Sequence, residues 1–409
     1  MDTPLLTNSA ILTTLPPDLA EVDFIVAGGG TAGSIIAARL SDAHPKASVL
    51  VIEAGPESFH LPSVVYPALY RKNISPTSTT LKFHFAAPEP QLADRSIPIL
   101  AGKTLGGGSA VNLLMYARGQ RADYNSWKAK GWETDELVSF LTKSETHFGL
   151  GQEATHGDNG PISISNSTYA SHTLQKEFMA SFNQIGYPTA PDIQDLETCS
   201  AVSTTYRTAS PATGRRQDTA YTYLYPRLER NQGRSLSVLV DARVLRVLFN
   251  DDKRATGVEF RSKSGGADQT VKARKLVILS AGAMGTPQIL EMSGVGDPEI
   301  LKRSGVPVVS PLLGVGREYQ DHQLIMTDYR ADLPPSENVD SVFNGVLNTA
   351  ELIQDHADIL SWNGVDASAK IRPTQAEIDT FKPALRKLWD EHFENEPSRP
   401  LGVIVAYAG

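Results

Sequence analysis

The stretch VDFIVAGGGTAGSIIAARL, residues 22–40, decides how the first part of this chain folds. It starts with a short run of strand-forming residues, passes through a glycine-rich turn and continues into a helix-compatible run. A second apolar run, VLVI at residues 49–52, follows and ends at Glu53. Strand, turn, helix and strand within about 32 residues match the size of one βαβ unit. The sequence therefore predicts an α/β fold for this part of the chain.

The glycine turn carries the pattern G-x-G-x-x-G at Gly28, Gly30 and Gly33. The first glycine permits a tight turn, the second lets the backbone approach a pyrophosphate, and the third lets helix and strand pack closely. The positive end of the following helix then points at the phosphates. Glu53 lies 20 residues after Gly33, where a carboxylate accepts the ribose hydroxyls of an adenosine. The pattern favours a dinucleotide site over a glycine turn that binds nothing. It does not choose between FAD and NAD, but Glu53 disfavours NADP because it would repel a 2′-phosphate.

Composition excludes several classes of protein. The 409 residues exceed one ordinary core, so we expect two domains or one two-lobed unit. With 38 Lys and Arg against 46 Asp and Glu, the chain has no basic surplus, and no nucleic-acid partner is expected. A single cysteine, Cys199, excludes an intramolecular disulfide and an all-cysteine metal site. No metal-binding motif is found, so no metal is expected.

The sequence shows no targeting or membrane-spanning segment. Residues Met1 to Asp23 lack a positive n-region and an unbroken apolar stretch, which argues against a secretory signal. No later segment offers about 18 uncharged apolar residues. The sequence ends in Tyr407-Ala408-Gly409, which is not a peroxisomal S-K-L tail. We therefore expect a cytoplasmic protein with no membrane partner.

Three further motifs carry a resemblance to a known family. They read GKTLGGGSAVNLLMYARG at 102–119, GAMGTPQILEMSGVG at 282–296 and GVGREYQDH at 314–322. In this order they resemble signatures of the glucose–methanol–choline (GMC) oxidoreductases, FAD enzymes that oxidise alcohols. Residues 363–374 look closest to the alcohol (methanol) oxidase branch. The resemblance implies FAD as the cofactor, and a Rossmann-like FAD-binding domain with a mixed-sheet substrate domain.

The resemblance also implies how FAD is held. The glycine-rich loop after Gly102 is expected to lie against the flat isoalloxazine, with its amides donating to the flavin or the pyrophosphate. Val244 matches a valine whose backbone contacts the adenine end, although an ordinary strand also favours valine there. Some relatives attach the flavin through a histidine at the position of Val111, so FAD is expected to be non-covalent. The cofactor-binding residues are predicted to be Gly28, Gly30, Thr31, Ala32, Gly33, Glu53, Ala54, Gly102, Gly107, Ser109, Asn112, Leu113, Met115 and Val244.

The catalytic residues remain unassigned from the sequence. In the family a histidine takes the alcohol proton while hydride passes to flavin N5, and this base lies near the C-terminus. None of the nine histidines belongs to a matching motif, and His322 is expected to be structural. One interpretation is an FAD-dependent alcohol oxidase or dehydrogenase that acts on the CH–OH group of a small alcohol. The other is a truncated, inactive GMC-fold protein, or one that needs a partner chain for its catalytic base. A homo-oligomer also stays open.

The domain boundaries follow from the order of the motifs. The fold class is expected to be α/β with an α+β second lobe. The FAD-binding domain is expected to comprise residues 20–60, 95–150 and 230–325. The substrate-binding domain, incomplete at its C-terminus, is expected to comprise residues 155–230 and 330–409.

Three local expectations can be compared with the structure. Residues 56–98, rich in proline and aromatic residues, are expected to form a surface excursion rather than sheet. Residues 235–249 and 257–260 alternate like an antiparallel hairpin, and 275–279 is expected to be a buried strand.

Overall fold

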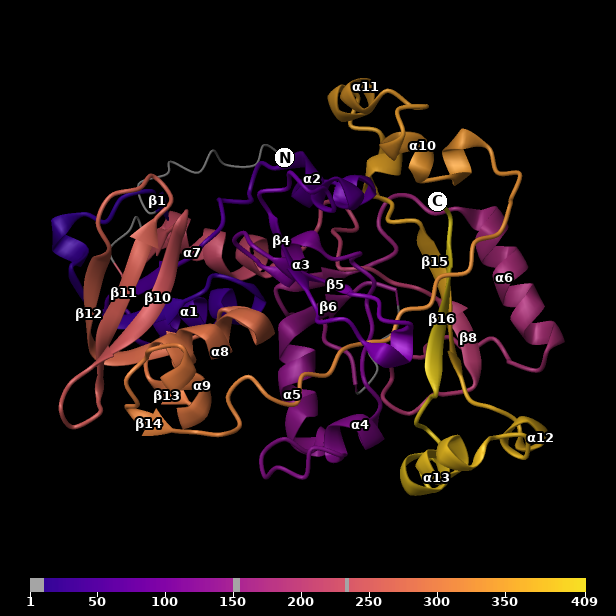
Figure 1. The fold of residues 1–409 in the computed structure, drawn as a ribbon. Coiled ribbons are helices and arrows are strands. Elements are labelled where there is room, and N and C mark those ends of the chain that lie inside the picture. The colour runs from indigo at the N-terminus through magenta and orange to yellow at the C-terminus, as the bar shows by residue number, and fades with distance from the viewer. Residues whose placement is uncertain (1–10, 150–154, 232–234) are drawn as a thin grey trace. The chain divides into compact units, whose positions relative to one another are not determined.

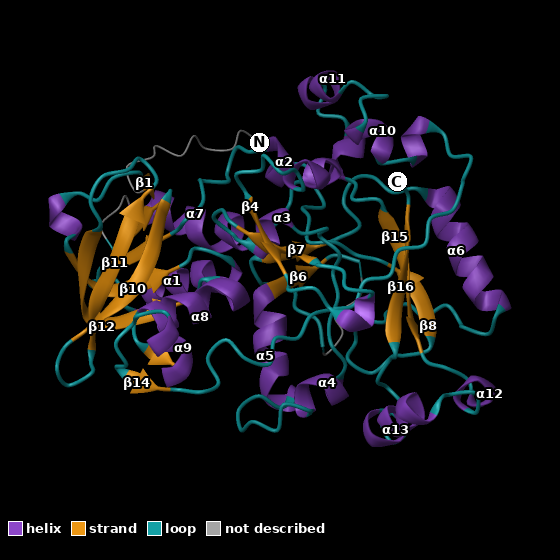
Figure 2. Cartoon of the chain, viewed as in Figure 1, coloured by secondary structure: helices purple, strands orange, loops and turns teal. Residues whose placement is uncertain are grey.

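The computed structural model of the protein describes residues 11–149, 155–231 and 235–409, drawn in Figures 1 and 2. The chain forms two compact units. Unit 1 consists of Met1–Val64, Asn73–Asn112 and Asp218–Arg330. Unit 2 consists of Val65–Lys72, Leu113–Gln217 and Ala331–Gly409. The division into two units does not test the roles predicted for the two domains. The boundaries differ in one respect, because residues 113–150, expected in the FAD-binding domain, lie in unit 2.

Unit 1 is built on a seven-stranded mixed sheet. Neighbouring strands pair in parallel from β1 to β12, and the last two strands add antiparallel pairs. A mixed sheet covered by helices agrees with the predicted α/β class. In pairing order the strands are β1 (Ile11–Leu12), β9 (Leu236–Leu239), β3 (Val49–Ile52), β2 (Glu21–Ala27), β12 (Gln269–Leu279), β11 (Ala255–Ser262) and β10 (Ala242–Phe249).

The strands β2 and β3 occupy the middle of this sheet because both of their faces are apolar. In β3, Val49 and Val51 pack into the core that includes Ala37 of helix α1 (Thr31–Ala43). Leu50 and Ile52 pack into a second core on the other face. Such continuous apolar runs are typical of parallel strands covered on both sides. This packing fixes the position of the glycine turn that joins β2 to α1.

One of the local expectations was wrong, and the expected hairpin is confirmed only from Ala242 onward. Within 56–98, β4 (Leu81–Phe85) pairs with β5 (Pro98–Gly102) in an antiparallel sheet, because Leu81 and Phe83 join an apolar cluster that the surrounding prolines disguise in the sequence. Residues 235–249 form two strands, since the chain turns at Asp241 with a φ of 53°. Only β10 then forms the expected hairpin with β11. The other elements of unit 1 are α2 (Pro62–Val65, at its boundary), α3 (Gly108–Val111), a π-helical turn (Ala220–Leu224), α7 (Tyr225–Asn231), α8 (Gly282–Met292), β13 (Val295–Gly296), α9 (Pro298–Arg303) and β14 (Ser310–Pro311).

The expectation of a buried strand at 275–279 was half right. These residues form the end of β12, but Leu276 is 53% exposed. β11 pairs with β12 only along Gln269–Lys272, whereas β2 pairs with it as far as Leu279. Within the part of the chain that the structure describes, no strand pairs with the second edge of Leu276–Leu279.

Unit 2 contains a three-stranded antiparallel sheet in the order β16 (Gly402–Tyr407), β15 (Val365–Ile371), β8 (Ala201–Thr204). Helix α6 (His172–Gln184) packs on it, with Phe182 of the helix against Val202 and Ala369 of the sheet. The other elements of unit 2 are α4 (Arg121–Asn125), α5 (Thr134–Ser144), β6 (Glu145–His147), β7 (Ile162–Ile164), α10 (Asp340–Phe343), α11 (Thr349–Gln354), α12 (Gln375–Ile378) and α13 (Pro383–His392).

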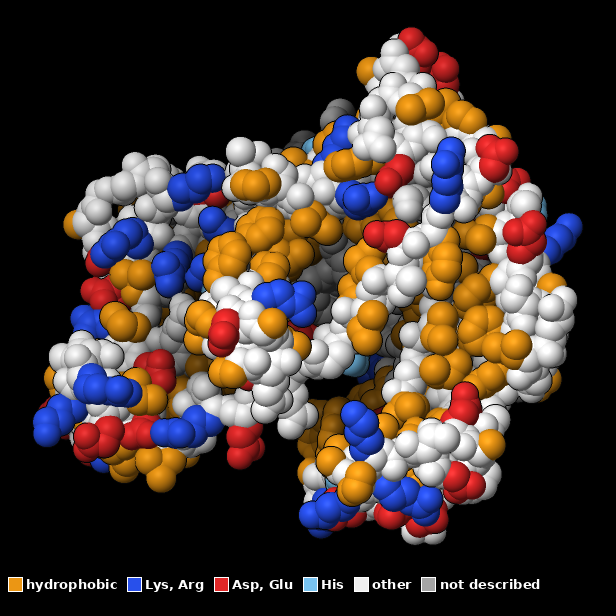
Figure 3. Space-filling view, turned by 45° about the vertical axis from the view of Figure 1, so that its right-hand side comes forward, with side chains coloured by type: hydrophobic (Ala, Val, Ile, Leu, Met, Phe, Trp, Pro, Cys, Tyr) orange, Lys and Arg blue, Asp and Glu red, His pale blue; other side chains and the backbone are white. Residues whose placement is uncertain are grey.

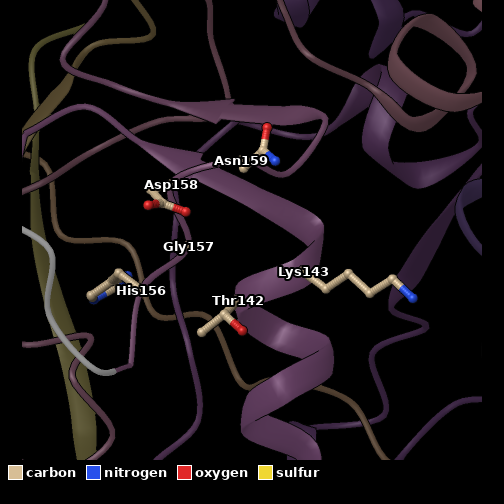
Figure 4. A pocket seen from close by; sticks show the side chains of 6 residues that line it. All are labelled: Thr142, Lys143, His156, Gly157, Asp158 and Asn159. Carbon is tan, nitrogen blue, oxygen red and sulfur yellow. The ribbon is translucent and has the colours of Figure 1, made fainter.

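A buried ionic cluster in unit 2 surrounds His156, which lies beside the surface pocket shown in Figure 4. The ring nitrogens of His156 bind Glu145 Oε1 at 3.0 Å and Asp192 Oδ2 at 2.9 Å, and Arg118 binds Glu145 at 2.8 Å. Burial alone lowers the pKa of His156, but the hydrogen bonds to Asp192 and Glu145 outweigh it and raise the pKa to about 8. The imidazolium therefore links the strand β6 to the loop that carries Asp192.

This cluster makes the stability of unit 2 depend on pH. Because the pKa of His156 is raised from 6.5 to about 8, its contribution is fully present below 6.5 and is lost as the pH rises through 8. The shift corresponds to about 2 kcal/mol. We expect urea unfolding to show His156→Gln less stable than wild type at pH 6, with the difference shrinking by about that amount at pH 9. The exposed His392 provides the control: His392→Gln is expected to show no such trend, and a pH-independent penalty in His156→Gln would contradict the assignment.

Candidate cofactor site

The turn between β2 and α1 needs glycine at two positions. Gly28 has a φ of +104°, and a Cβ there would lie 2.5 Å from the carbonyl oxygen of Ser280. A Cβ on Gly33 would lie 1.9 Å from the carbonyl oxygen of Gly28. The turn and the close packing of helix on strand therefore match the roles that the pattern predicts for these glycines.

The N-terminus of α1 presents backbone groups rather than a capping side chain. Gly30 is the N-cap residue, and no side chain caps the helix. The Thr31 and Ala32 N–H groups, in the first turn, have no partner inside the helix. A Cβ on Gly30 would have its nearest neighbour 3.6 Å away. The helix dipole makes this end of α1 attractive to an anion.

Glu53 follows β3 and is held by backbone donors. Its Oε2 accepts a hydrogen bond from the N–H of Gly29 and its Oε1 one from Gly55, both at 2.8 Å. Burial raises the pKa of the Glu53 carboxyl, while the N–H groups of Gly55, Gly29 and Ala54 act in the opposite direction. Each carboxylate oxygen keeps a further lone pair for a donor such as a hydroxyl group. Glu53 is thus fixed beside the glycine turn, as the motif predicts for a ribose-binding carboxylate.

The second glycine-rich loop, between β5 and α3, lies against the first. The N–H of Gly106 donates to the carbonyl of Gly29 at 2.9 Å. The Thr31 hydroxyl donates to the carbonyl of Gly106 and accepts from the N–H of Ser109, both at 3.2 Å. The Ser109 hydroxyl in turn donates to the Gly106 carbonyl at 2.7 Å. Thr31 and Ser109 therefore brace the two loops against each other.

The positions of the second loop differ in whether contacts within the protein require glycine there. A Cβ on Gly102 would lie 2.4 Å from the carbonyl carbon of Gly107. A Cβ on Gly107 would lie 2.7 Å from Gly30 Cα, and Gly107 has a φ of +53°. Contacts within the protein thus account for these two glycines. Gly108 differs, because a Cβ there would meet no described atom within 4 Å. The open space above the loop lies at Gly108.

Val244 is held near Glu53 through the backbone of β10. The N–H of Ala242 donates to the carbonyl of Glu53 at 2.9 Å. The Val244 side chain packs in the apolar core, and its backbone lies at a register shift between Val244 and Arg246 in the β10–β11 pairing. The position of Val244 is compatible with both roles considered from the sequence. Its side chain packs in the core, as an ordinary strand valine does, and the β10–β11 pairing is interrupted beside its backbone, which a backbone contact to the adenine end requires.

The remaining predicted residues are divided between the units. Asn112 is exposed at the end of α3 in unit 1. Leu113 and Met115 belong to unit 2. There the carbonyl of Leu113 accepts a hydrogen bond from Asn363 at 2.6 Å, and Met115 forms a β-bridge with Arg207. All of the predicted cofactor-binding residues except Leu113 and Met115 therefore belong to unit 1.

Two residues of this site were missed by sequence reasoning. Leu105 is fully buried and packs under the first loop, 2.7 Å from where a Cβ on Gly29 would lie. Asp218 Oδ1 accepts the N–H groups of Ala220 and Tyr221, and it would lie 2.6 Å from a Cβ on Gly106. Asp218 supports a loop more than 100 residues earlier in the chain, so no local pattern reveals it.

The structure assigns no catalytic base. His44 follows α1 and stacks on Phe24 at 5.7 Å. Burial, followed by the charge of Lys82, lowers the pKa of His84 on β4. His322 is exposed. Both ring nitrogens of His156 are occupied by carboxylates.

Within residues 11–149, 155–231 and 235–409, no cluster of three or more His, Cys, Asp or Glu side chains is placed to hold a metal. Likewise, no helix in these ranges has both the length and the apolar character needed to cross a bilayer.

Known proteins resemble this chain over most of its length. It is 33% identical over 390 residues to the alcohol oxidase of Candida boidinii. The aligned region covers 93% of this chain and 58% of that protein. It is 32% identical to alcohol oxidase 2 of Komagataella phaffii, covering 95% and 60%. Over 77% of its residues it is 33% identical to an oxygen-dependent choline dehydrogenase of Yersinia pestis, of which 55% is matched. The chain thus spans about three fifths of the length of these relatives.

Solved structures show the same fold. An FAD-dependent oxidoreductase from Chaetomium thermophilum superposes with a TM-score of 0.77 at 25% identity, covering 95% of this chain and 72% of the other. A formate oxidase superposes with a TM-score of 0.78 at 22% identity, covering 95% and 68%. The family model described as GMC oxidoreductase matches residues 22–324. This match and the relatives of 32–33% identity show that the chain belongs to the GMC oxidoreductase family.

Proposed function

We propose that this chain binds FAD without a covalent bond and serves the oxidation of an alcohol CH–OH group by hydride transfer to flavin N5. The observation that supports it best is the cradle in unit 1, defined by Gly30, Gly108, Glu53 and the N-terminus of α1. No side chain caps α1 there, a Cβ on Gly108 would meet no described atom within 4 Å, and a buried carboxylate lies beside the turn. The matched relatives include alcohol oxidases and a choline dehydrogenase.

The residues of the cradle fit a dinucleotide. The first-turn N–H groups of α1 suit a pyrophosphate, and the remaining lone pairs of Glu53 suit the two ribose hydroxyls of the adenosine. Val111 supports a non-covalent cofactor, because it is 8% exposed and its side chain packs with Val64 and Leu81. FAD, when bound, supplies the acceptor for two electrons and a proton equivalent from the alcohol. The substrate class proposed is a small primary or secondary alcohol, with oxygen or an artificial acceptor as the oxidant.

The chain's own residues act here by binding and orienting. Thr31 and Ser109 hold the two loops in register, so the amides of both loops are fixed before a ligand arrives. Fixed donors stabilise developing negative charge without reorganisation. The general base that takes the hydroxyl proton is not assigned to any of these residues, because no histidine accompanies the cradle motifs.

The second candidate is a protein that needs a partner chain for its catalytic base, and one observation favours it. The edge of β12 along Leu276–Leu279 is unpaired among the described residues, and Leu276 is 53% exposed. A strand from a second polypeptide fits such an edge by backbone pairing. Purification from the native source followed by mass spectrometry tests this candidate. A stoichiometric second chain that restores alcohol-dependent reduction supports it, and full activity of this chain alone excludes it.

Removing the charge of Glu53 is expected to weaken FAD binding. A charge-assisted hydrogen bond contributes about 1.5–3 kcal/mol, so Glu53→Gln should raise the Kd for FAD by roughly tenfold to a hundredfold. Flavin fluorescence titration of the apoprotein measures the change. The exposed Glu299 supplies the matched control, and Glu299→Gln should bind FAD as wild type does. Equal affinity of Glu53→Gln and wild type would remove Glu53 from the site.

Substitutions at the adjacent residues Gly107 and Gly108 are expected to have different effects, one on the stability of the fold and the other on FAD binding. Gly108→Val places its side chain in open space, so we expect an unchanged melting temperature without cofactor and a lower affinity for FAD. Gly107→Ala places its Cβ against Gly30 at a positive φ, so we expect a loss of about 1–3 kcal/mol of stability before any ligand is added. Thermal melts of both apoproteins, followed by FAD titration, distinguish them. Undiminished FAD affinity in Gly108→Val would place the cofactor elsewhere.

The proposed reaction itself is tested by anaerobic reduction. The FAD-loaded protein is mixed with a panel of primary and secondary alcohols in the absence of oxygen, and the absorption band of the oxidised flavin is followed. We expect at least one alcohol to bleach the band and to yield the matching aldehyde or ketone in equal amount. FAD binding without bleaching by any alcohol would leave the second candidate. A protein that remains colourless after incubation with FAD would contradict both.

A further inference from the structure

A π-helical turn lies beside the second glycine loop of unit 1. It comprises Ala220–Leu224 and runs directly into α7. Ala220 and Leu224 are fully buried in the core that also contains Ala37 of α1. Turns of this kind are rare and occur frequently at functional sites. The N-cap residue of the turn is Thr219, but its side chain makes no capping hydrogen bond. The hydroxyl group of Thr219 therefore serves another partner.

That partner is the hydroxyl group of Ser109 in the second glycine loop. Ser109 donates its proton to the carbonyl of Gly106 at 2.7 Å. Its oxygen accepts a hydrogen bond from the N–H of Thr219 at 3.1 Å, and the Thr219 hydroxyl lies 3.2 Å from the same oxygen. A hydroxyl group has one proton and two lone pairs. Since the proton of Ser109 goes to Gly106, the proton between the two hydroxyl groups comes from Thr219. Thr219 thus holds Ser109 at two points.

A buried carboxylate fixes this turn against the loop. Figure 3 shows Lys, Arg, Asp and Glu side chains on the surface of the molecule, but Asp218 and Thr219 are each only 3% exposed. Acidic side chains are almost never buried to this extent without partners. Asp218 Oδ1 accepts the N–H groups of Ala220 and Tyr221, both at 3.0 Å. The same oxygen would lie 2.6 Å from a Cβ on Gly106. Asp218 therefore sets the direction in which Thr219 meets the loop.

We propose that Thr219 is a positioning residue for the cofactor and that it acts through Ser109. This inference rests on the proposed function, because it assigns a further residue to the same FAD site. Ser109 directly follows Gly108, and its N–H donates to the Thr31 hydroxyl at 3.2 Å. The place of Ser109 therefore determines how the loop presents its backbone at Gly108 and beside α1. Holding Ser109 before FAD arrives lowers the entropy lost on binding.

Fluorescence titration of the full chain with FAD tests this role. Thr219→Val keeps the shape of the side chain but removes the hydroxyl group, so we expect the Kd to rise by about threefold to tenfold, as for the loss of one neutral hydrogen bond. Thr219→Ser keeps the hydroxyl group and should restore the affinity of the wild type. Thr222→Val is the matched control, because the Thr222 hydroxyl belongs to the same turn but donates to the Asp218 carbonyl at 2.9 Å. This control should bind FAD as the wild type does, and thermal melts verify that each variant is folded.

A double-mutant cycle tests whether Thr219 acts through Ser109. Ser109→Ala should weaken FAD binding by itself, and adding Thr219→Val should then cause little further loss, because the group that Thr219 holds is gone. A further loss as large as in the wild-type background would overturn the proposal. Unchanged affinity in Thr219→Val, or equal weakening in Thr222→Val, would overturn it as well while leaving the proposed function intact. A wild type that binds no FAD would contradict the proposed function and this inference with it.

Discussion

The contact between the two glycine loops is the constraint on which the candidate site depends. The N–H of Gly106 donates to the carbonyl of Gly29, and Gly107 lies so close to Gly30 that a Cβ on Gly107 would lie 2.7 Å from Gly30 Cα. Each loop therefore limits the conformations of the other. Thr31 and Ser109 add hydrogen bonds across the same contact. With the loops locked together, the N-terminus of α1 and the carboxylate of Glu53 are positioned in advance, which lowers the entropy lost when a ligand binds.

Much of unit 1 could be predicted because its signals are local. The apolar runs of β2 and β3, the glycine turn and Glu53 all lie within residues 22–53, and the structure has them where the pattern indicates. The structural role of each individual glycine could not be predicted from the sequence. Gly107 and Gly108 look equivalent in the sequence, but one meets backbone and the other meets open space. That difference arises from contacts with residues about 75 positions away.

The parts that could not be predicted rest on distant contacts. Asp218 supports the loop at Gly106, and the cluster around His156 joins Arg118, Glu145 and Asp192 from separate segments. No periodicity marks such polar partners, since each is specified by the tertiary structure alone. The strand β4 was hidden by the prolines around it, and the exposure of Leu276 was invisible because an apolar run reads as buried. The catalytic base remains beyond both the motifs and the described geometry.

The parallel pairing of β2 with β12 has a consequence for the synthesis of the protein. Phe24 pairs with Leu276, about 250 residues later in the chain. A nascent chain on the ribosome therefore leaves this edge of β2 unpaired until β12 has emerged. Contacts of such long sequence separation slow folding, because the loop between them must be closed first. Until β12 is in place, the unpaired edge of β2 is open to non-native strand pairing.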